Sequence, residues 1–315
     1  MPYARTVAQH LNSVHHEVFV SREDFVGALP NLIWHEDEPI VWPSSVSLFF
    51  VAQLARERAK VVLTGEGSDE TLAGYSRYAF ILKNLAFDRV YRGLVPRGVR
   101  GRVRDFIATS SWINASARRK LSHTFLGRDG ESWASFYCDN FFPAFNQKDQ
   151  SDLLADDFRD EILTGSAYRN VLGYWERSSG ELLQRLLYTD IKTYLVELLM
   201  KQDNMSMAAS VESRVPFLDH VLVEWATRVP ARIQIRGSSG KWILKKAMED
   251  LLPHSIIYRQ KLGVSNALEW LAGGHSTGRH RAPAFGTSQH EPRIAEARRR
   301  RKALPRASSP ISRPL

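Results

Sequence analysis

One stretch limits the possible fold more than any other: KVVLTGEGSDETLAGYSRY, residues 60–78. An apolar run of three residues is followed at once by three glycines and three carboxylates. Glycine is favoured where the backbone must turn tightly or approach another group closely. Neighbouring carboxylates repel one another unless a cation or a proton separates them. The stretch therefore predicts a strand, a glycine turn and a carboxylate-bearing helix start, the layout of a site at the carboxyl end of a strand. The glycines are Gly65, Gly67 and Gly74, and the carboxylates are Glu66, Asp69 and Glu70.

The elements around this stretch alternate. The sequence predicts a helix near residues 6–11, a short strand at 16–20, a helix from a Ser44 or Ser45 cap to about Arg58, and a strand at 60–66. Helices that alternate with apolar strands favour a parallel, doubly wound α/β layer. Downstream, we expect irregular helices from about Phe80, one long helix over 181–200, and a capped helix that begins near Gly240. The predicted fold is α/β, a parallel sheet with a largely helical remainder to about residue 265.

Length and composition exclude several classes of protein. A chain of 315 residues suggests about two domains. Cys138 is the only cysteine, which excludes an internal disulfide framework and a cysteine-rich zinc site and suits a reducing compartment. No apolar run approaches the roughly 18 residues of a membrane span, and the first residues have no signal-peptide pattern. We therefore expect a soluble cytoplasmic protein.

The net charge of +9 is concentrated at one end of the chain. Residues 273–315 contain ten Lys or Arg and two Glu, which leaves the rest of the chain almost neutral. We expect this basic tail to be disordered. Such a tail can bind nucleic acid or acidic lipid non-specifically, or it can be a solvated extension. The sequence contains no motif for specific nucleic-acid recognition.

The first cluster that could carry chemistry is LTGEGSDE, residues 63–70. A carboxylate beside a glycine turn can hold Mg²⁺ that bridges phosphates, and a second can take a proton from an amine. The alternative is a helix N-terminus enriched in acid because of the helix dipole. Capping alone does not require the glycines, which favours a functional turn.

Two further clusters leave alternatives open. In residues 198–220, Asp203 and Arg214 lie among other charges, as substrate contacts or as parts of a structural ion-pair network. Lys241 follows Gly240 at a predicted helix start, where a cation is unfavourable unless it faces an anion such as a polyphosphate. The pair His15-His16 has no companion metal ligands nearby and is better explained as a polar loop pair.

Three motifs together resemble a known family. VVLTGEGSDETLAGYSRY, LLMKQDNMSMAASVESRVPFLDH and GKWILKKAMEDLLPHSIIYRQKLGV are similar, in this order, to the synthetase domain of glutamine-hydrolysing asparagine synthetases. The resemblance runs from about Tyr3 to Leu271. It divides the chain into a partial synthetase domain, residues 1–272, and the tail, residues 273–315. It also implies a sheet of the adenine-nucleotide alpha-hydrolase (ATP pyrophosphatase) type, incomplete at its N-terminus.

The resemblance implies a reaction and a role for each matching residue. Aspartate attacks the α-phosphate of ATP to give β-aspartyl-AMP and pyrophosphate, and ammonia then displaces AMP. Fixed cations best stabilise the charge that develops on a leaving phosphate. The implied roles are nucleotide contact for Thr64 and Gly65, acid–base chemistry for Glu66, Mg²⁺ binding for Asp69, pyrophosphate stabilisation for Lys241, and aspartate binding for Asp203 and Arg214.

The sequence also departs from the family. The family's pyrophosphate loop, Ser-Gly-Gly-x-Asp-Ser, does not occur here, and no cysteine follows Met1 as the nucleophile of a glutaminase domain. We therefore expect a truncated synthetase that forms little β-aspartyl-AMP and takes nitrogen from free ammonia or a glutaminase partner. A homo-oligomer is also possible. The alternative is a non-catalytic remnant or assembly partner.

Overall fold

The structure is a computed structural model that describes residues 2–40, 42–128, 137–138 and 168–259. The chain divides into two compact units. The first contains residues 1–62, 201–213 and 248–315, and the second contains residues 63–200 and 214–247.

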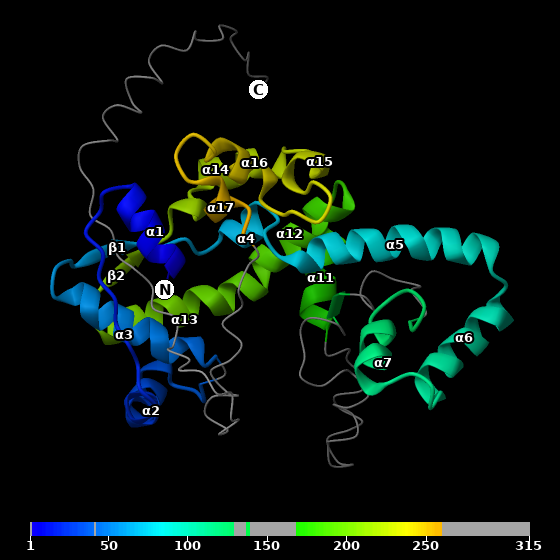
Figure 1. Ribbon diagram of the computed structural model, residues 1–315, viewed down its shortest axis with the longest axis horizontal. Coiled ribbons are helices and arrows are strands. Elements are labelled where there is room, and N and C mark those ends of the chain that lie inside the picture. The colour runs from blue at the N-terminus through cyan, green and yellow to red at the C-terminus, as the bar shows by residue number, and fades with distance from the viewer. Residues whose placement is uncertain (1, 41, 129–136, 139–167, 260–315) are drawn as a thin grey trace, which may run out of the picture. The chain divides into compact units, whose positions relative to one another are not determined.

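In the first unit, three helices precede the sheet (Figure 1). They are α1 (Pro2–His10), α2 (Arg22–Glu36) and α3 (Ser44–Arg56). A reciprocal capping box begins α2: the Asp24 N–H donates to the Ser21 hydroxyl over 3.0 Å, and the Ser21 N–H donates to the Asp24 carboxylate over 2.9 Å. The core contains Phe25, Leu32 and Phe49 together with Met205 from the end of α13 (Tyr194–Ala208). The last helix of this unit within the described residues is α17 (His254–Ile257).

The second unit is almost entirely helical. A buried core joins the start of α5 to α12, with Tyr78, Ile81, Leu183 and Leu186 at its centre. In Figure 1, the long helix α5 leads to α6, which folds back toward α7. The helices are α4 (Ser68–Thr71), α5 (Ser76–Leu94), α6 (Arg97–Thr109), α7 (Ala115–Ser122), α11 (Arg169–Arg177), α12 (Leu182–Lys192), the 3-10 turn η1 (Pro216–Leu218), α14 (His220–Thr227), α15 (Ala231–Gln234) and α16 (Trp242–Ala247).

The sheet in the described residues has two strands, β1 (Val61–Leu63) and β2 (Glu212–Arg214). The Glu212 N–H donates to the Lys60 carbonyl over 2.8 Å, and the Thr64 N–H donates to the Arg214 carbonyl over 2.9 Å. This alternation of donors is the parallel pattern, so the carboxyl ends of both strands lie at the same edge. The strand predicted at 60–66 is confirmed in a shorter form, and the α/β class is confirmed with a smaller sheet than a doubly wound layer needs.

Several local predictions are wrong. Residues 16–20 form no strand, and the helix expected over 181–200 is two helices, α12 and α13, separated at Thr193. Pro43, without a side-chain hydrogen bond, occupies the N-cap of α3 instead of a serine. The tail from residue 273 lies outside the described residues. Within the described ranges, no helix is both long and apolar enough to cross a membrane.

Candidate functional site

The turn between β1 and α4 explains two features of the glycine-rich stretch. The Ser68 hydroxyl donates to the Gly65 carbonyl over 2.7 Å, which closes the turn. Gly67 has φ +82° at the N-cap of α4, a left-handed conformation that suits glycine. A Cβ on Gly67 would also lie 2.2 Å from a methyl carbon of Leu218 in η1. The predicted tight turn is therefore confirmed, and the sequence RVPFLD forms the packed turn against which it lies.

The three carboxylates of this stretch have different surroundings. Glu70 is only 1% exposed and accepts a hydrogen bond of 2.5 Å from the Tyr75 hydroxyl. Burial raises the pKa of Glu70, and the Tyr75 hydrogen bond offsets this only in part. Glu66 is half-buried and has no ion pair or hydrogen bond from its side chain among the described residues. Asp69 forms an ion pair, so the carboxylates do not act as one group.

The partner of Asp69 is Lys241, from a distant part of the chain. The Lys241 Nζ lies 3.0 Å from Asp69 Oδ1 and donates to the Ser68 hydroxyl over 2.8 Å. Lys241 and Ser68 are 173 residues apart in sequence. Both side chains of the ion pair remain 21% exposed, so the pair is partly open to solvent. The predicted association of Lys241 with the carboxylate turn is found in the second unit.

Close backbone contacts fix the position of Lys241. Its N–H donates to the Leu72 carbonyl over 3.2 Å, and a Cβ on Gly240 would lie 2.2 Å from the Ala73 carbonyl oxygen. A Cβ on Gly74 would lie 1.9 Å from Asp69 Oδ1 and 2.2 Å from Lys241 Cε. Only glycine fits at positions 74 and 240 without displacing these groups.

Two residues at this contact have unusual backbone conformations. Lys241 has φ +53° and Ala73 has φ +55°, in the left-handed region that residues with a Cβ seldom adopt. Such conformations cost about 1–3 kcal/mol each and persist where the surrounding structure fixes them, often at functional sites. This strain gives Lys241 a position that simple helix capping does not require.

A buried ion pair lies behind the turn and was not identified from the sequence. Arg77, in the first turn of α5, lies 2.6 Å from the carboxylate of Asp190 in α12. The Arg77 guanidinium lies 4.2 Å from the ring centre of Tyr75 and 4.6 Å from that of Tyr194. Asp190 also accepts a hydrogen bond from the Tyr78 hydroxyl. The aromatic residues and the arginine of the GYSRY segment indicated a cluster of this kind, whereas nothing in the sequence around Asp190 did.

The ionisation of the buried pair follows from its surroundings. Burial raises the pKa of Asp190, and the adjacent Arg77 guanidinium offsets part of that rise. Burial, the largest single effect, lowers the pKa of Arg77, but Asp190, Tyr78 and Tyr75 together raise it by more, so Arg77 stays charged. Since Tyr75 also bonds Glu70, the cluster connects α12 to the segment that carries Asp69 and contacts Lys241.

Of the remaining predicted residues, Arg214 and Thr64 border the turn, and Asp203 belongs to the first unit. The Arg214 carbonyl accepts from the Thr64 N–H, so its backbone borders the turn, and its side chain is exposed. The Thr64 hydroxyl is buried without a hydrogen-bond partner in the described part of the chain. Asp203 is exposed on α13 in the first unit, and its proximity to the turn stays a prediction.

No group of three His, Cys, Asp or Glu side chains that could hold a metal ion occurs in the described ranges. Magnesium commonly uses one or two protein carboxylates together with phosphate oxygens. Asp69, whose side chain is partly exposed beside the turn, is the carboxylate predicted to hold such an ion, and its metal binding stays a prediction.

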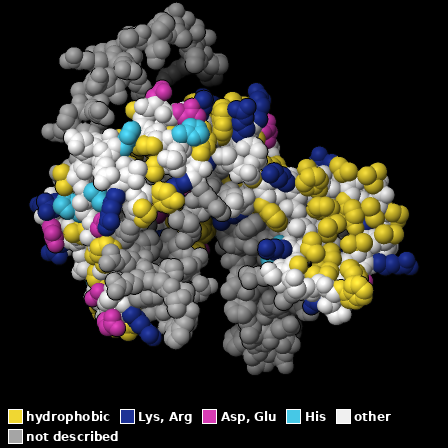
Figure 2. All heavy atoms as spheres, in the orientation of Figure 1, with side chains coloured by type: hydrophobic (Ala, Val, Ile, Leu, Met, Phe, Trp, Pro, Cys, Tyr) yellow, Lys and Arg dark blue, Asp and Glu magenta, His cyan; other side chains and the backbone are white. Residues whose placement is uncertain are grey.

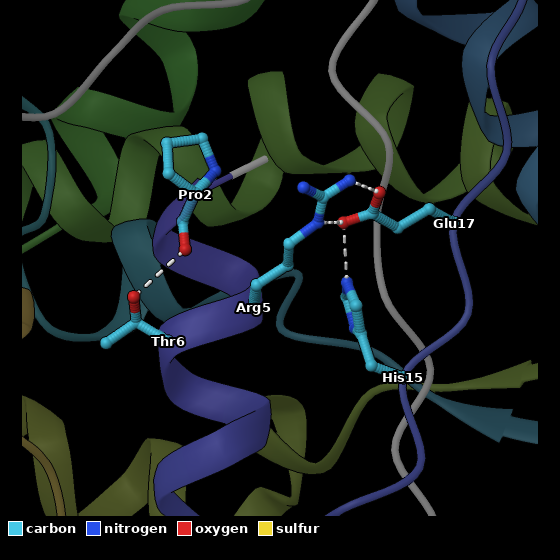
Figure 3. Close-up of polar contacts among 5 residues, drawn as sticks. All are labelled: Pro2, Arg5, Thr6, His15 and Glu17. Carbon is cyan, nitrogen blue, oxygen red and sulfur yellow. Dashed lines mark hydrogen bonds and ion pairs between the residues drawn. The ribbon is translucent and has the colours of Figure 1, made fainter.

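A separate cavity of about 460 Å³ in the first unit contains His15. His15 Nε2 lies 2.9 Å from the Glu17 carboxylate, and the Arg5 Nε donates to the same carboxylate over 2.7 Å (Figure 3). His15 thus lies in a polar loop, as expected, although its partners Glu17 and Arg5 were not predicted, and these contacts tie α1 to the segment that precedes α2.

The chain was compared with known proteins. The family model for asparagine synthase matches residues 1–305. The chain is 31% identical over 279 residues to a Mycobacterium tuberculosis protein described as an asparagine synthetase of the glutamine-hydrolysing type, covering 85% of this chain and 39% of that protein. It is 30% identical over 257 residues to asparagine synthetase 1 of Bacillus subtilis (78% and 36%), and 23% identical over 291 residues to amidase chyE of Penicillium rubens (86% and 42%). The chain thus spans less than half the length of these relatives.

Proposed function

The chain belongs to the asparagine synthase family, and on this premise we propose that it carries part of an ATP-dependent amide-forming synthetase. In the proposed reaction, an aspartate β-carboxylate oxygen attacks the α-phosphorus of ATP, and the bond to the β-phosphate breaks. Pyrophosphate leaves and β-aspartyl-AMP forms. Ammonia then attacks the acyl carbon, AMP leaves, and a base takes the proton released from nitrogen. A sheet of the adenine-nucleotide alpha-hydrolase type is part of this proposal.

The contact among Lys241, Asp69 and Ser68 is the observation on which the proposal depends. An ammonium group with three donors, fixed by a strained backbone and partly open to solvent, suits a leaving polyphosphate. A lysine placed only to pair with Asp69 would not need the glycines at 74 and 240. In the proposed site, Lys241 neutralises the charge on departing pyrophosphate.

The nucleotide would contact the turn that precedes α4. The Thr64 hydroxyl is buried without a hydrogen-bond partner in the described residues, and the adjacent Gly65 leaves open space, since a Cβ there would meet nothing within 4 Å. Asp69 would hold Mg²⁺, which when bound neutralises phosphate charge. Glu66 would accept the proton from the attacking amine, because its carboxylate has no competing partner in the described residues.

The acceptor is proposed to be aspartate, with Arg214 and Asp203 as its contacts. The planar guanidinium of Arg214 can pair with a carboxylate through two hydrogen bonds. The relatives include an amidase, so glutamate and other carboxylic acids belong in the same assay.

The test is binding followed by turnover, using the full chain. Isothermal titration should show binding of ATP and of pyrophosphate in the presence of Mg²⁺, weakened about 10-fold or more by Lys241→Ala. Lys246→Ala is the matched control, because Lys246 is exposed on α16, the helix that follows Lys241. If Lys241→Ala binds pyrophosphate as the unmodified chain does, the assignment of Lys241 is wrong.

ATP–pyrophosphate exchange with Mg²⁺ and aspartate then separates the two candidate functions. Exchange shows that the chain forms an acyl-adenylate. Binding without exchange favours the alternative, a non-catalytic member or assembly partner of the family. A glutaminase partner or a second subunit that restores amide formation would identify the source of nitrogen.

A further inference from the structure

Large apolar side chains are exposed along α5, α6 and the turn that follows them. We call this set the apolar ridge; its most exposed members are Leu94, 78% exposed, and Trp112, 93% exposed. Figure 2 shows apolar side chains gathered over the region that α5 and α6 form in Figure 1. A large contiguous patch of exposed apolar side chains often marks an interaction site. The ridge consists of Phe87, Val90, Leu94, Val99, Phe106 and Trp112.

Packing within the second unit does not account for the ridge. Phe87, Val90 and Leu94 follow one another at intervals of three and four residues, so they lie along one side of α5. The residues of α5 that are buried, Ile81 and Asp88 among them, belong to its other side. On α6 the buried residue is Ile107, whereas Val99 and Phe106 are exposed. Apart from the contact of Phe87 with Phe125, whose ring centres lie 5.9 Å apart, this apolar surface of both helices remains exposed.

The charges beside the ridge are mostly positive, with Asp105 an exposed acid on α6. From Arg89 to Arg104 the chain contains six arginines and no acidic residue. Arg89, Arg97 and Arg102 are exposed, and Arg92 pairs with Asp88 over 2.9 Å. The surface therefore combines exposed Trp, Phe and Leu with arginines.

Three kinds of partner could bind such a surface: a second copy of the chain, an acidic protein or a lipid layer. The combination of apolar side chains and arginines favours the lipid layer. A second copy of the chain is disfavoured, because the two sets of arginines would repel each other. An acidic protein would use a groove or pocket for its anchors, but the cavity beside Tyr91, Arg100 and Arg104 holds only about 10 Å³. A lipid headgroup layer needs no groove, since it accepts projecting apolar side chains while arginines reach the phosphates.

We propose that the apolar ridge docks the chain on an anionic lipid surface, with Leu94 and Trp112 inserted at the boundary between headgroups and acyl chains. The association is peripheral and needs no spanning helix. It is independent of the proposed synthetase function, because the residues of the ridge are separate from Lys241 and the turn.

Vesicle binding by the full chain tests the proposal, with the basic tail kept in every variant. The vesicles contain phosphatidylcholine alone or with phosphatidylserine. We expect binding to the anionic vesicles only, and a loss of at least about tenfold in partitioning for the double substitution Leu94→Ser and Trp112→Ser. The matched control is Trp34→Ser with Leu251→Ser, since Trp34 is 81% exposed and both residues lie in the other unit.

A second measurement reports insertion directly. Cys138 is buried, so an environment-sensitive dye attached to Leu94→Cys labels one accessible site. We expect its emission to shift to shorter wavelength on anionic vesicles, and no shift for a dye on Arg58→Cys in the first unit.

Three results would overturn the proposal. The first is equal vesicle binding by the ridge variant, which would assign binding to the tail. The second is no shift of the Leu94→Cys dye, or no binding at all. The third is a lipid-free dimer that Trp112→Ser dissociates, which would make the ridge an interface between copies.

Discussion

The carboxylate of Asp190 lies 2.6 Å from the guanidinium of Arg77, and both side chains are buried. This ion pair joins α12 to the first turn of α5, directly after the turn that contacts Lys241. The aromatic rings of Tyr75 and Tyr194 cover the guanidinium. The geometry of the candidate site therefore depends on a charge pair that does not itself face the site.

Removing one member of this pair should destabilise the fold strongly. Asp190→Ala leaves the Arg77 charge buried without its carboxylate, which typically costs about 3–5 kcal/mol. Chemical denaturation of the full chain measures the change in the free energy of unfolding. The double substitution Asp190→Leu with Arg77→Met serves as the control, because it removes both charges and should recover much of the loss. A double variant as unstable as Asp190→Ala would show that packing, and not the buried charge, is responsible.

A methyl group at position 240 should disturb the site. Gly240→Ala places a Cβ 2.2 Å from the Ala73 carbonyl oxygen, and backbone cannot yield as a flexible side chain does. Overpacking of this kind typically costs about 1–3 kcal/mol, and the displacement of Lys241 should weaken pyrophosphate binding. Thermal unfolding and titration calorimetry measure the two effects.

Gly101→Ala is the matched control for Gly240→Ala. Gly101 lies within α6, where an added Cβ meets nothing within 4 Å. Alanine in a helix interior is favoured over glycine by about 0.5–1 kcal/mol, so the control should be neutral or stabilising. A Gly240→Ala chain that matches this control in stability and binding would contradict the close contact.

The cluster of Arg5, His15 and Glu17 should make the first unit sensitive to acid. The hydrogen bond from Arg5, with a further one from His15, lowers the pKa of Glu17 to about 2, below its ordinary value of 4.5. Stabilisation from a carboxylate with a lowered pKa is complete above the unfolded pKa and is lost as the pH falls from about 4.5 toward 2. Glu17→Gln should therefore be less stable than the unmodified chain at neutral pH, with the difference disappearing in acid. A difference that does not depend on pH between 6 and about 2 would exclude the ionised carboxylate as its cause.

The pattern of residues along the chain predicted those parts of the site that are formed by a single strand or turn. The strand at Val61–Leu63 and the turn at Gly67 followed from an apolar run and from glycine, and both are confirmed. Helix α2 was not predicted, because Gly27 and Pro30 lie inside it and both usually oppose helix. The strand expected at 16–20 is absent, and an apolar run needs a neighbouring strand that the sequence does not reveal.

Contacts between distant segments were harder to predict. Asp190 lies in an amphipathic helical pattern, where a single carboxylate usually faces solvent. Its burial depends on Arg77, which is more than 100 residues away in sequence. The association of Lys241 with the glycine turn was expected only because three motifs resemble one family, and its partner Asp69 was identified from the structure.

The ion pair between Asp69 and Lys241 should make pyrophosphate binding depend on Mg²⁺ in a specific way. Without Mg²⁺, the Asp69 carboxylate competes with pyrophosphate for the ammonium group 3.0 Å away and repels the added negative charge. Asp69→Asn should therefore bind metal-free pyrophosphate several-fold more tightly than the unmodified chain. The same variant should lose the gain in affinity that Mg²⁺ gives, since a neutral amide is a weaker ligand than a carboxylate. Titration calorimetry with and without Mg²⁺ measures both effects, and Asp105→Asn, which removes an exposed charge on α6, is the control. If Asp69→Asn binds metal-free pyrophosphate more weakly while Mg²⁺ still increases its affinity, then Asp69 positions Lys241 and does not hold the metal.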